Sequence, residues 1–190
     1  MGSAAAAALR VRRFPTDRHG GGTAEHAAIQ RNFAIAVGGR LRGKSCRYYG
    51  SDLKADTSET IRYPDGFVVC SPAVRGVTRI ADPVVVFEVL SDSSARTDLI
   101  VKNHEYAGVP SVKRYIVLSQ DEMSGTMFER IGTDWVGHLL NAGSILRMPE
   151  IDIELPLAEL YPGAGGCTDS SYLFCQFGLR RSAKALGPSI

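Results

Sequence analysis

The feature that most constrains the fold of this chain is an almost unbroken apolar run, Pro83-Val84-Val85-Val86-Phe87-Glu88-Val89-Leu90. β-Branched and aromatic residues favour strands, and a run without polar alternation is typical of a strand buried on both faces of a sheet. Serines that can N-cap a helix follow the run, so a helix is predicted over 95–107. A second strand is predicted over 112–119. This strand–helix–strand order predicts a mixed α/β domain.

Shorter patterns on both sides predict the remaining elements. Thr23 can N-cap a helix over 24–42, which has apolar residues four apart on one face. Further strands are expected over 46–55, 67–70, 125–131 and 135–140, and a helical turn is expected over 156–160. The predicted fold class is therefore α/β (α+β mixed), with a central mixed β-sheet flanked by helices.

A chain of 190 residues has the length of a single domain. We expect that domain over 23–163, between a flexible basic leader over 1–22 and an irregular basic tail over 164–190. The formal net charge of +2 is unevenly spread, because the leader carries +3, the tail +2 and the domain −3. The small total charge is therefore no argument against a DNA partner.

Missing motifs exclude several classes of protein. No apolar run approaches the ~18 residues of a membrane span, so no membrane partner is expected. The four cysteines form no CxxC pair, which argues against zinc and predicts free thiols in a reducing cytoplasm. P-loop, nucleophile-elbow and dinucleotide-binding motifs are also missing. We expect a cytoplasmic protein.

Two carboxylates are placed where they can do chemistry. Asp65 lies at the start of one predicted strand, and Glu88 lies inside the apolar run. An ionised glutamate in a buried strand is costly unless it is compensated. Two such acids and a strand carbonyl, here that of Val89, form a hard-oxygen site suited to Mg²⁺. Alternatively, Glu88 pairs with a lysine or arginine, or points outward at the edge of the sheet.

A lysine near these acids would suit phosphodiester hydrolysis, which requires charge stabilisation at the phosphate and a positioned water. The position two residues after the glutamate, where such a lysine most often lies, is Leu90. Lys102 lies on the following helix, four residues after Asp98. The two are either an exposed i,i+4 pair worth a few tenths of a kcal/mol, or Lys102 reaches back over the sheet. Spacing alone leaves both readings open.

In order and spacing, the motifs Tyr63-Pro64-Asp65, Val86-Phe87-Glu88-Val89-Leu90-Ser91 and Asp98-x-x-x-Lys102-x-x-x-Tyr106 resemble the bacterial Uma-type family of predicted restriction endonucleases. That family belongs to the PD-(D/E)xK nuclease superfamily. The resemblance covers about residues 23–163 and includes the segments Pro110-Ser111-Val112 and Glu154-Leu155-Pro156-Leu157.

The resemblance implies an endonuclease that hydrolyses DNA phosphodiester bonds with Mg²⁺, or alternatively Mn²⁺, as its cofactor. It assigns Asp65, Glu88 and the Val89 carbonyl to the metal. It assigns Lys102 to the attacked phosphate or to the water. Asp52 and Asp98 are second-tier candidates, Asp52 being equally well explained as a turn residue.

This chain also departs from the family pattern. The leader stands where family members begin with a hairpin-like segment, so edge strands are expected to be missing. Arg114 replaces an acid that commonly precedes the tyrosine of its strand, and the tail matches nothing in the family. The alternative is therefore a catalytically impaired nuclease-fold protein that acts in nucleic-acid or protein binding. A homodimer is compatible with either function.

Basic residues gather in the segment between Glu25 and Asp52, where no acid interrupts them. Clustered cations are what a DNA backbone requires, although for any single residue a solvated helix face is the slightly better explanation. These candidate nucleic-acid-binding residues are Arg31, Arg40, Arg42, Lys44 and Arg47. His26, near the start of the first helix, is expected to have a capping or surface role.

Overall fold

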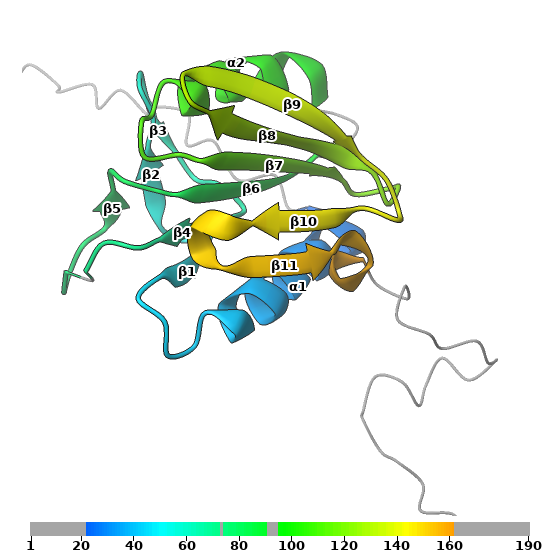
Figure 1. Cartoon of the computed structure of the whole chain (residues 1–190), viewed down its shortest axis with the longest axis horizontal. Helices are drawn as coiled ribbons and strands as arrows, with labels where there is room; N and C mark the ends of the chain where they lie inside the picture. Colours follow the sequence, from blue (N-terminus) through cyan, green and yellow to red (C-terminus); the bar gives the residue numbers. More distant parts are fainter. Residues whose placement is uncertain (1–21, 73, 91–94, 162–190) are drawn as a thin grey trace, which may run out of the picture.

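The computed structural model describes residues 22–72, 74–90 and 95–161, and for 95–98 it describes the backbone alone. Its centre is a six-stranded sheet in the order β1-β4-β6-β7-β8-β9 (Figure 1). Within this sheet, β6 and β7 run parallel and the other neighbouring strands are antiparallel. The strands are β1 (Arg47–Gly50), β4 (Gly66–Val69), β6 (Val85–Leu90), β7 (Arg114–Ser119), β8 (Gly125–Ile131) and β9 (Asp134–Leu140).

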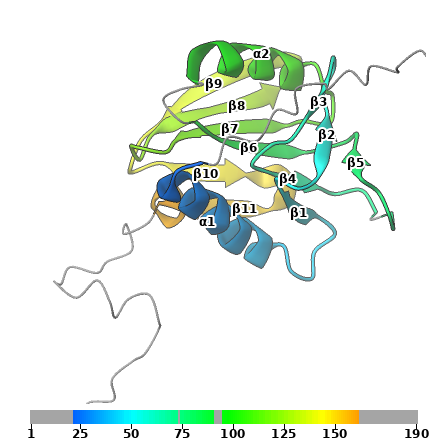
Figure 2. The same ribbon diagram turned by 180° about the vertical axis from the view of Figure 1, so that it is seen from behind.

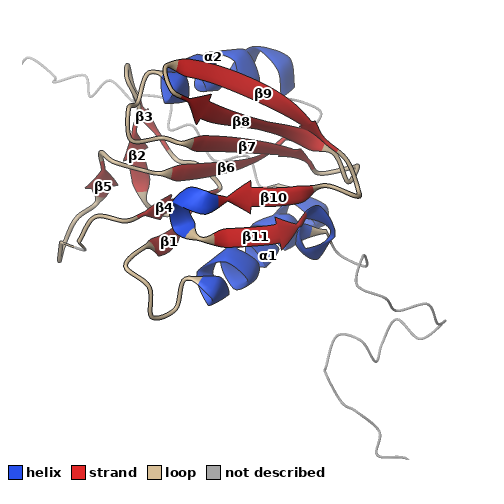
Figure 3. Ribbon diagram, in the orientation of Figure 1, coloured by secondary structure: helices blue, strands red, loops and turns tan. Residues whose placement is uncertain are grey.

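Two smaller sheets accompany the central one (Figure 3). The three-stranded sheet has the order β3-β2-β5, and the two-stranded sheet pairs β10 with β11. Their strands are β2 (Lys54–Asp56), β3 (Ile61–Arg62), β5 (Arg79–Ile80), β10 (Ile145–Met148) and β11 (Ile153–Pro156). The short 3-10 helices η1 (Pro149–Ile151) and η2 (Leu157–Leu160) connect and follow the β10–β11 pair.

The two α-helices lie on different faces of the central sheet. α1 (Ala24–Arg40) packs with the β10–β11 pair on one face, and the view from behind shows it in front of β11 (Figure 2). α2 (Ala95–Ala107) packs with the β3-β2-β5 sheet on the other face. Neither helix in the described ranges combines the length and the apolar character that a membrane span requires.

The alternation of side chains along the strands divides the core into two clusters. Val85, Phe87 and Val89 of β6 point toward α1, whereas Val86 points toward α2. Because β6 is covered on both faces, each of these four side chains is at most 5% exposed. The apolar run therefore forms a strand buried on both faces, as its composition predicts.

The mixed α/β fold and several element bounds are confirmed. α2 spans the predicted 95–107, β8 begins and ends as expected, and Thr23 caps α1 through a hydrogen bond from the His26 N–H. The expected strand over 46–55 is wrong, since a turn after Gly50 divides it into β1 and β2. The predicted leader over 1–22, apart from Gly22, and the predicted tail over 164–190 lie outside the described residues.

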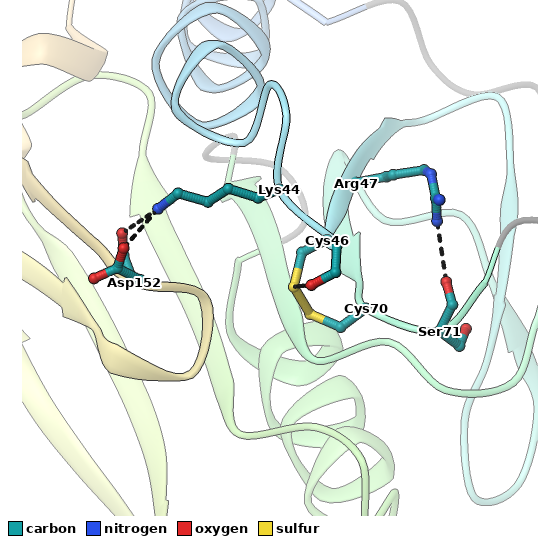
Figure 4. The surroundings of a disulfide bond; sticks show 7 residues. Lys44, Cys46, Arg47, Cys70, Ser71 and Asp152 are labelled. Carbon is teal, nitrogen blue, oxygen red and sulfur yellow. Dashed lines mark hydrogen bonds and ion pairs between the residues drawn. A yellow bond between two sulfur atoms is a disulfide. The ribbon is translucent and has the colours of Figure 1, made fainter.

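Cys46 and Cys70 form a disulfide (Figure 4). Arg47 pairs with Val69 in the antiparallel β1–β4 ladder, so the two cysteines occupy the next opposing positions, with Cα atoms 3.9 Å apart. The expectation of free thiols is wrong for this pair, because spacing along the sequence carries no information on strand register. The other two cysteines lie outside the described residues.

Candidate active site

Strand register brings Asp65 and Glu88 together at one end of the central sheet. Gly66 of β4 lies opposite Phe87 of β6, so Asp65 and Glu88 occupy the next opposing positions of this antiparallel pair. The backbone N–H of Val89 donates a hydrogen bond of 2.6 Å to Asp65 Oδ2. The strand register therefore places the two acids at opposing positions on neighbouring strands.

Two residues of α1, one helical turn apart, hold the Asp65 carboxylate. Gln30 Nε2 donates to Asp65 Oδ1 at 2.5 Å, and His26 Nε2 lies 3.3 Å from Oδ2. The His26 ring nitrogen also lies 3.1 Å from the carbonyl oxygen of Val89. The hydrogen bond to Asp65 raises the pKa of His26 against the opposing effect of burial. Asp65 is thus fixed in orientation by contacts to both of its oxygens.

Glu88 projects toward the other helix. Its side chain is 6% exposed, and its Oε2 lies 3.2 Å from Lys102 Nζ of α2. The lysine therefore reaches back over the sheet to the buried glutamate. Tyr106, one turn further along α2, is fully buried, and burial together with the charge of Glu88 raises its pKa well above the usual value. Its phenol stays neutral beside the carboxylate.

Gly66 is required by the packing beside Asp65. A Cβ atom at this position would overlap the hydroxyl group of Tyr48 and lie 2.7 Å from its ring carbon Cζ. Burial, and secondarily the charge of Asp65, raises the pKa of Tyr48. The glycine thus lets a neutral tyrosine pack against the turn that presents Asp65.

The oxygen atoms of Asp65, Glu88 and the Val89 carbonyl are of the chemical type that a hard divalent cation binds. Two carboxylates and the Val89 carbonyl supply only oxygen, the ligand type that Mg²⁺ prefers. Across the described ranges, no three side chains of His, Cys, Asp or Glu are arranged as a metal-binding group. What converges is Asp65 Oδ2, the carbonyl oxygen of Val89 and His26 Nε2, that is, two side chains and one backbone oxygen.

The family model described as "Putative restriction endonuclease", Uma2, matches residues 19–158. The chain belongs to the Uma2 family. A relative, an uncharacterized protein of Synechocystis sp., is 29% identical over 148 residues, which are 76% of this chain and 78% of the relative.

A solved structure supports the fold of this Uma2 domain. The crystal structure of "a putative nuclease belonging to DUF820" from Anabaena variabilis matches with a TM-score of 0.62. The match covers 73% of this chain and 81% of the other, at 14% sequence identity. At that identity, the likeness shows a shared fold.

The second-tier acids of the Uma2 domain lie in a turn and in a helix. Asp52 is exposed in the turn after β1, at the same sheet end as Asp65, because Gly50 pairs with Gly66. Asp98 lies in α2, but its side chain falls outside the described residues.

Two of the basic residues proposed for DNA are ion-paired with acids outside this site. Arg40 is ion-paired with Glu159, and Lys44 with Asp152. At 1.5 Å per residue, Arg40 lies about 21 Å along α1 from His26. Arg47 donates to the Ser71 carbonyl, Arg31 contacts the Asn32 side chain, and Arg42 is exposed.

Sequence analysis missed two residues of this site, His26 and Gln30. His26 was expected to cap a helix or lie on the surface, yet its side chain is only 16% exposed and faces Asp65. The available signal was the i,i+4 spacing, which puts both polar side chains on one helix face. That spacing does not say which strand end the face meets.

Arg114, one of the departures noted in the sequence, has a structural explanation. Its side chain is buried and ion-paired with Glu129 of β8 and with Glu150 of η1. Burial raises the pKa of Glu150, whereas the guanidinium beside Glu129 holds the pKa of that carboxyl below its usual value despite burial. The arginine thus joins the central sheet to the β10–β11 unit.

Proposed function

We propose that this Uma2 domain is a PD-(D/E)xK endonuclease that hydrolyses DNA phosphodiester bonds with a divalent cation, Mg²⁺ or Mn²⁺. The observation that carries the proposal is the 3.2 Å contact between Lys102 Nζ and Glu88 Oε2. It puts an ammonium beside one of two acids on neighbouring strands, although the lysine lies on a helix 14 residues later in the chain.

Each residue has a role that follows from its surroundings. Asp65, Glu88 and the Val89 carbonyl would hold the ion. When bound, such an ion polarises a phosphoryl oxygen and makes a bound water more acidic. Lys102, whose side chain is 17% exposed, keeps its ammonium in a largely dehydrated setting where charge stabilisation of the attacked phosphate is strong. Gln30 keeps Asp65 in one orientation through Oδ1.

Plasmid cleavage tests the proposal. The full chain is expected to nick or linearise DNA with Mg²⁺ or Mn²⁺ and to stop in EDTA. Asp65→Asn, Glu88→Gln and Lys102→Ala should each lower the rate on the order of 10²-fold or more. Lys113→Ala is the matched control, because the Lys113 side chain is exposed and its ammonium donates to the nearby Pro110 carbonyl. Equal cleavage by the parent and all variants would contradict the proposal.

The second candidate is a nuclease-fold protein that binds nucleic acid or protein without cleaving. The observation in its favour is that Glu88 is already paired with Lys102, as a buried carboxylate in a purely structural role would be. DNA binding in a mobility-shift assay, without cleavage under any divalent ion, would favour this candidate. Metal-dependent cleavage that is lost in Lys102→Ala would exclude it.

A further inference from the structure

We propose that His26 Nε2 is itself a ligand of the divalent ion, next to Asp65 Oδ2 and the Val89 carbonyl, and that it makes the site prefer Mn²⁺ to Mg²⁺. The inference rests on the proposed metal-dependent function and adds a nitrogen ligand from α1 to it.

The geometry of the ring carries the first step. His26 Nε2 lies 3.3 Å from Asp65 Oδ2 and 3.1 Å from the Val89 carbonyl oxygen, so one nitrogen faces two hard oxygens. A proton on Nε2 points between these oxygens. In the other neutral tautomer, the Nε2 lone pair points in the same direction. The three atoms that surround this proton are therefore arranged so that a cation in its place would contact all of them.

Two features at the start of α1 position the imidazole. His26 is the third residue of α1, and its backbone N–H is fixed by the side chain of the capping Thr23. Gly22 packs against the Nδ1 edge of the ring so closely that a Cβ atom there would overlap Nδ1 and lie 2.9 Å from Cγ. Glycine before the cap thus leaves the space that the ring needs.

Gln30 and His26 contact different oxygens of the Asp65 carboxylate. It donates to Oδ1, so the other oxygen, Oδ2, is the one that faces His26 and the Val89 N–H. A carboxylate held in this way presents one oxygen to an ion while the second is kept by a neutral amide. Supporting hydrogen bonds of this kind commonly change metal affinity 10–100-fold.

Ligand chemistry gives the metal preference. Mg²⁺ favours oxygen ligands in octahedral geometry and binds imidazole poorly, whereas transition metals accept nitrogen. Two carboxylates and a carbonyl alone would suit Mg²⁺. Adding His26 shifts the site toward Mn²⁺, and further toward Co²⁺, which follows Mn²⁺ in the order of affinities for such sites.

Metal binding to the full chain tests the inference without relying on activity. Calorimetric titration is expected to give a dissociation constant at least about tenfold lower for Mn²⁺ than for Mg²⁺. Pulsed electron paramagnetic resonance of the Mn²⁺ complex should show a directly coordinated ¹⁴N, which changes to ¹⁵N in protein grown with labelled histidine. This spectroscopic readout uses the unmutated chain, so it does not depend on whether a variant folds.

Variants then assign the nitrogen. His26→Ala should abolish the ¹⁴N coupling and raise the Mn²⁺ dissociation constant about tenfold, while changing that for Mg²⁺ far less. Gly22→Ala, which displaces the ring but keeps the histidine, should weaken Mn²⁺ binding in the same direction. His104→Ala is the matched control, because that side chain is 80% exposed on α2 and contacts Glu59.

Two results would overturn the inference, and they are distinguishable. Mn²⁺ binding without a ¹⁴N coupling, or with equal affinity for Mg²⁺, would remove His26 from the ligand set and leave the two-carboxylate site of the proposed function. No binding of either ion would remove the metal-dependent function as well.

Discussion

Reducing the Cys46–Cys70 disulfide is expected to lower the free energy of unfolding by about 3.5 kcal/mol. The bridge joins residues 24 apart. In the chain-entropy account, releasing a loop of that length restores on the order of 12 cal/mol/K to the unfolded chain, which is about 3.5 kcal/mol at 25 °C. The folded state loses little, because the β1–β4 ladder keeps both cysteines opposite each other.

Urea unfolding followed by circular dichroism, with and without dithiothreitol, measures this difference. The background should carry Cys167→Ser and Cys175→Ser, so that only the described bridge responds to reductant. For a slope of about 2 kcal/mol per M urea, the midpoint should fall by roughly 1.7 M on reduction. A Cys46→Ala/Cys70→Ala variant in the same background should be insensitive to dithiothreitol.

A midpoint that moves by less than about 0.5 M would refute the reasoning. Mass spectrometry after alkylation under denaturing conditions then identifies the failing step. If the oxidised protein carries two alkyl groups, the bridge does not form. If it carries none, the bridge forms, and the unfolded chain keeps the two strand segments close without it.

Three further results are expected. Gly39→Ala should stabilise the domain by up to about 1 kcal/mol, because Gly39 lies within α1 and a Cβ there meets nothing within 4 Å. Gly125→Ala should destabilise the domain by about 2 kcal/mol or more, since the added Cβ would overlap the Val117 carbonyl oxygen. Thermal unfolding of the two glycine variants measures both effects. The hydrogen bond from Arg62 lowers the pKa of Glu105 in the folded protein. The ionised Glu105 therefore contributes its full stabilisation above the ordinary pKa of 4.5, and this stabilisation is lost as the pH falls through the lower pKa of the folded state. Between pH 5 and pH 3 the parent should therefore lose more free energy of unfolding than Glu105→Gln, and an equal loss would contradict this assignment.

The elements that sequence analysis predicted well are those with strong local signals. The apolar run of β6, the capped start of α1 and the bounds of α2 depend on composition and capping within a few residues. β10 and β11 were not predicted, because four alternating residues are too few to distinguish from a loop. β3 and β5, of two residues each, exist only because they pair with β2.

The candidate site was predicted in part for a similar reason. Asp65 and Glu88 could be placed because their strands were predicted and an acid in an apolar run is conspicuous. The role of Lys102 was assigned from the family resemblance, because no local sequence pattern indicates which part of a sheet the side chains of a helix contact. The contacts of His26 and Gln30 arise from the packing of α1 against the central sheet. This packing is a feature of the tertiary structure that local sequence patterns do not predict.

The packing of α1 against η2 determines when, during synthesis, the contacts that hold this helix can form. The helix that carries His26 and Gln30 packs against η2, where Asn32 donates to the Leu160 carbonyl and Arg40 pairs with Glu159. At 5–20 residues per second, the ribosome makes that surface on the order of ten seconds after α1. The nascent chain therefore holds every proposed site residue several seconds before η2 exists, so the contacts between α1 and η2 form only after that delay.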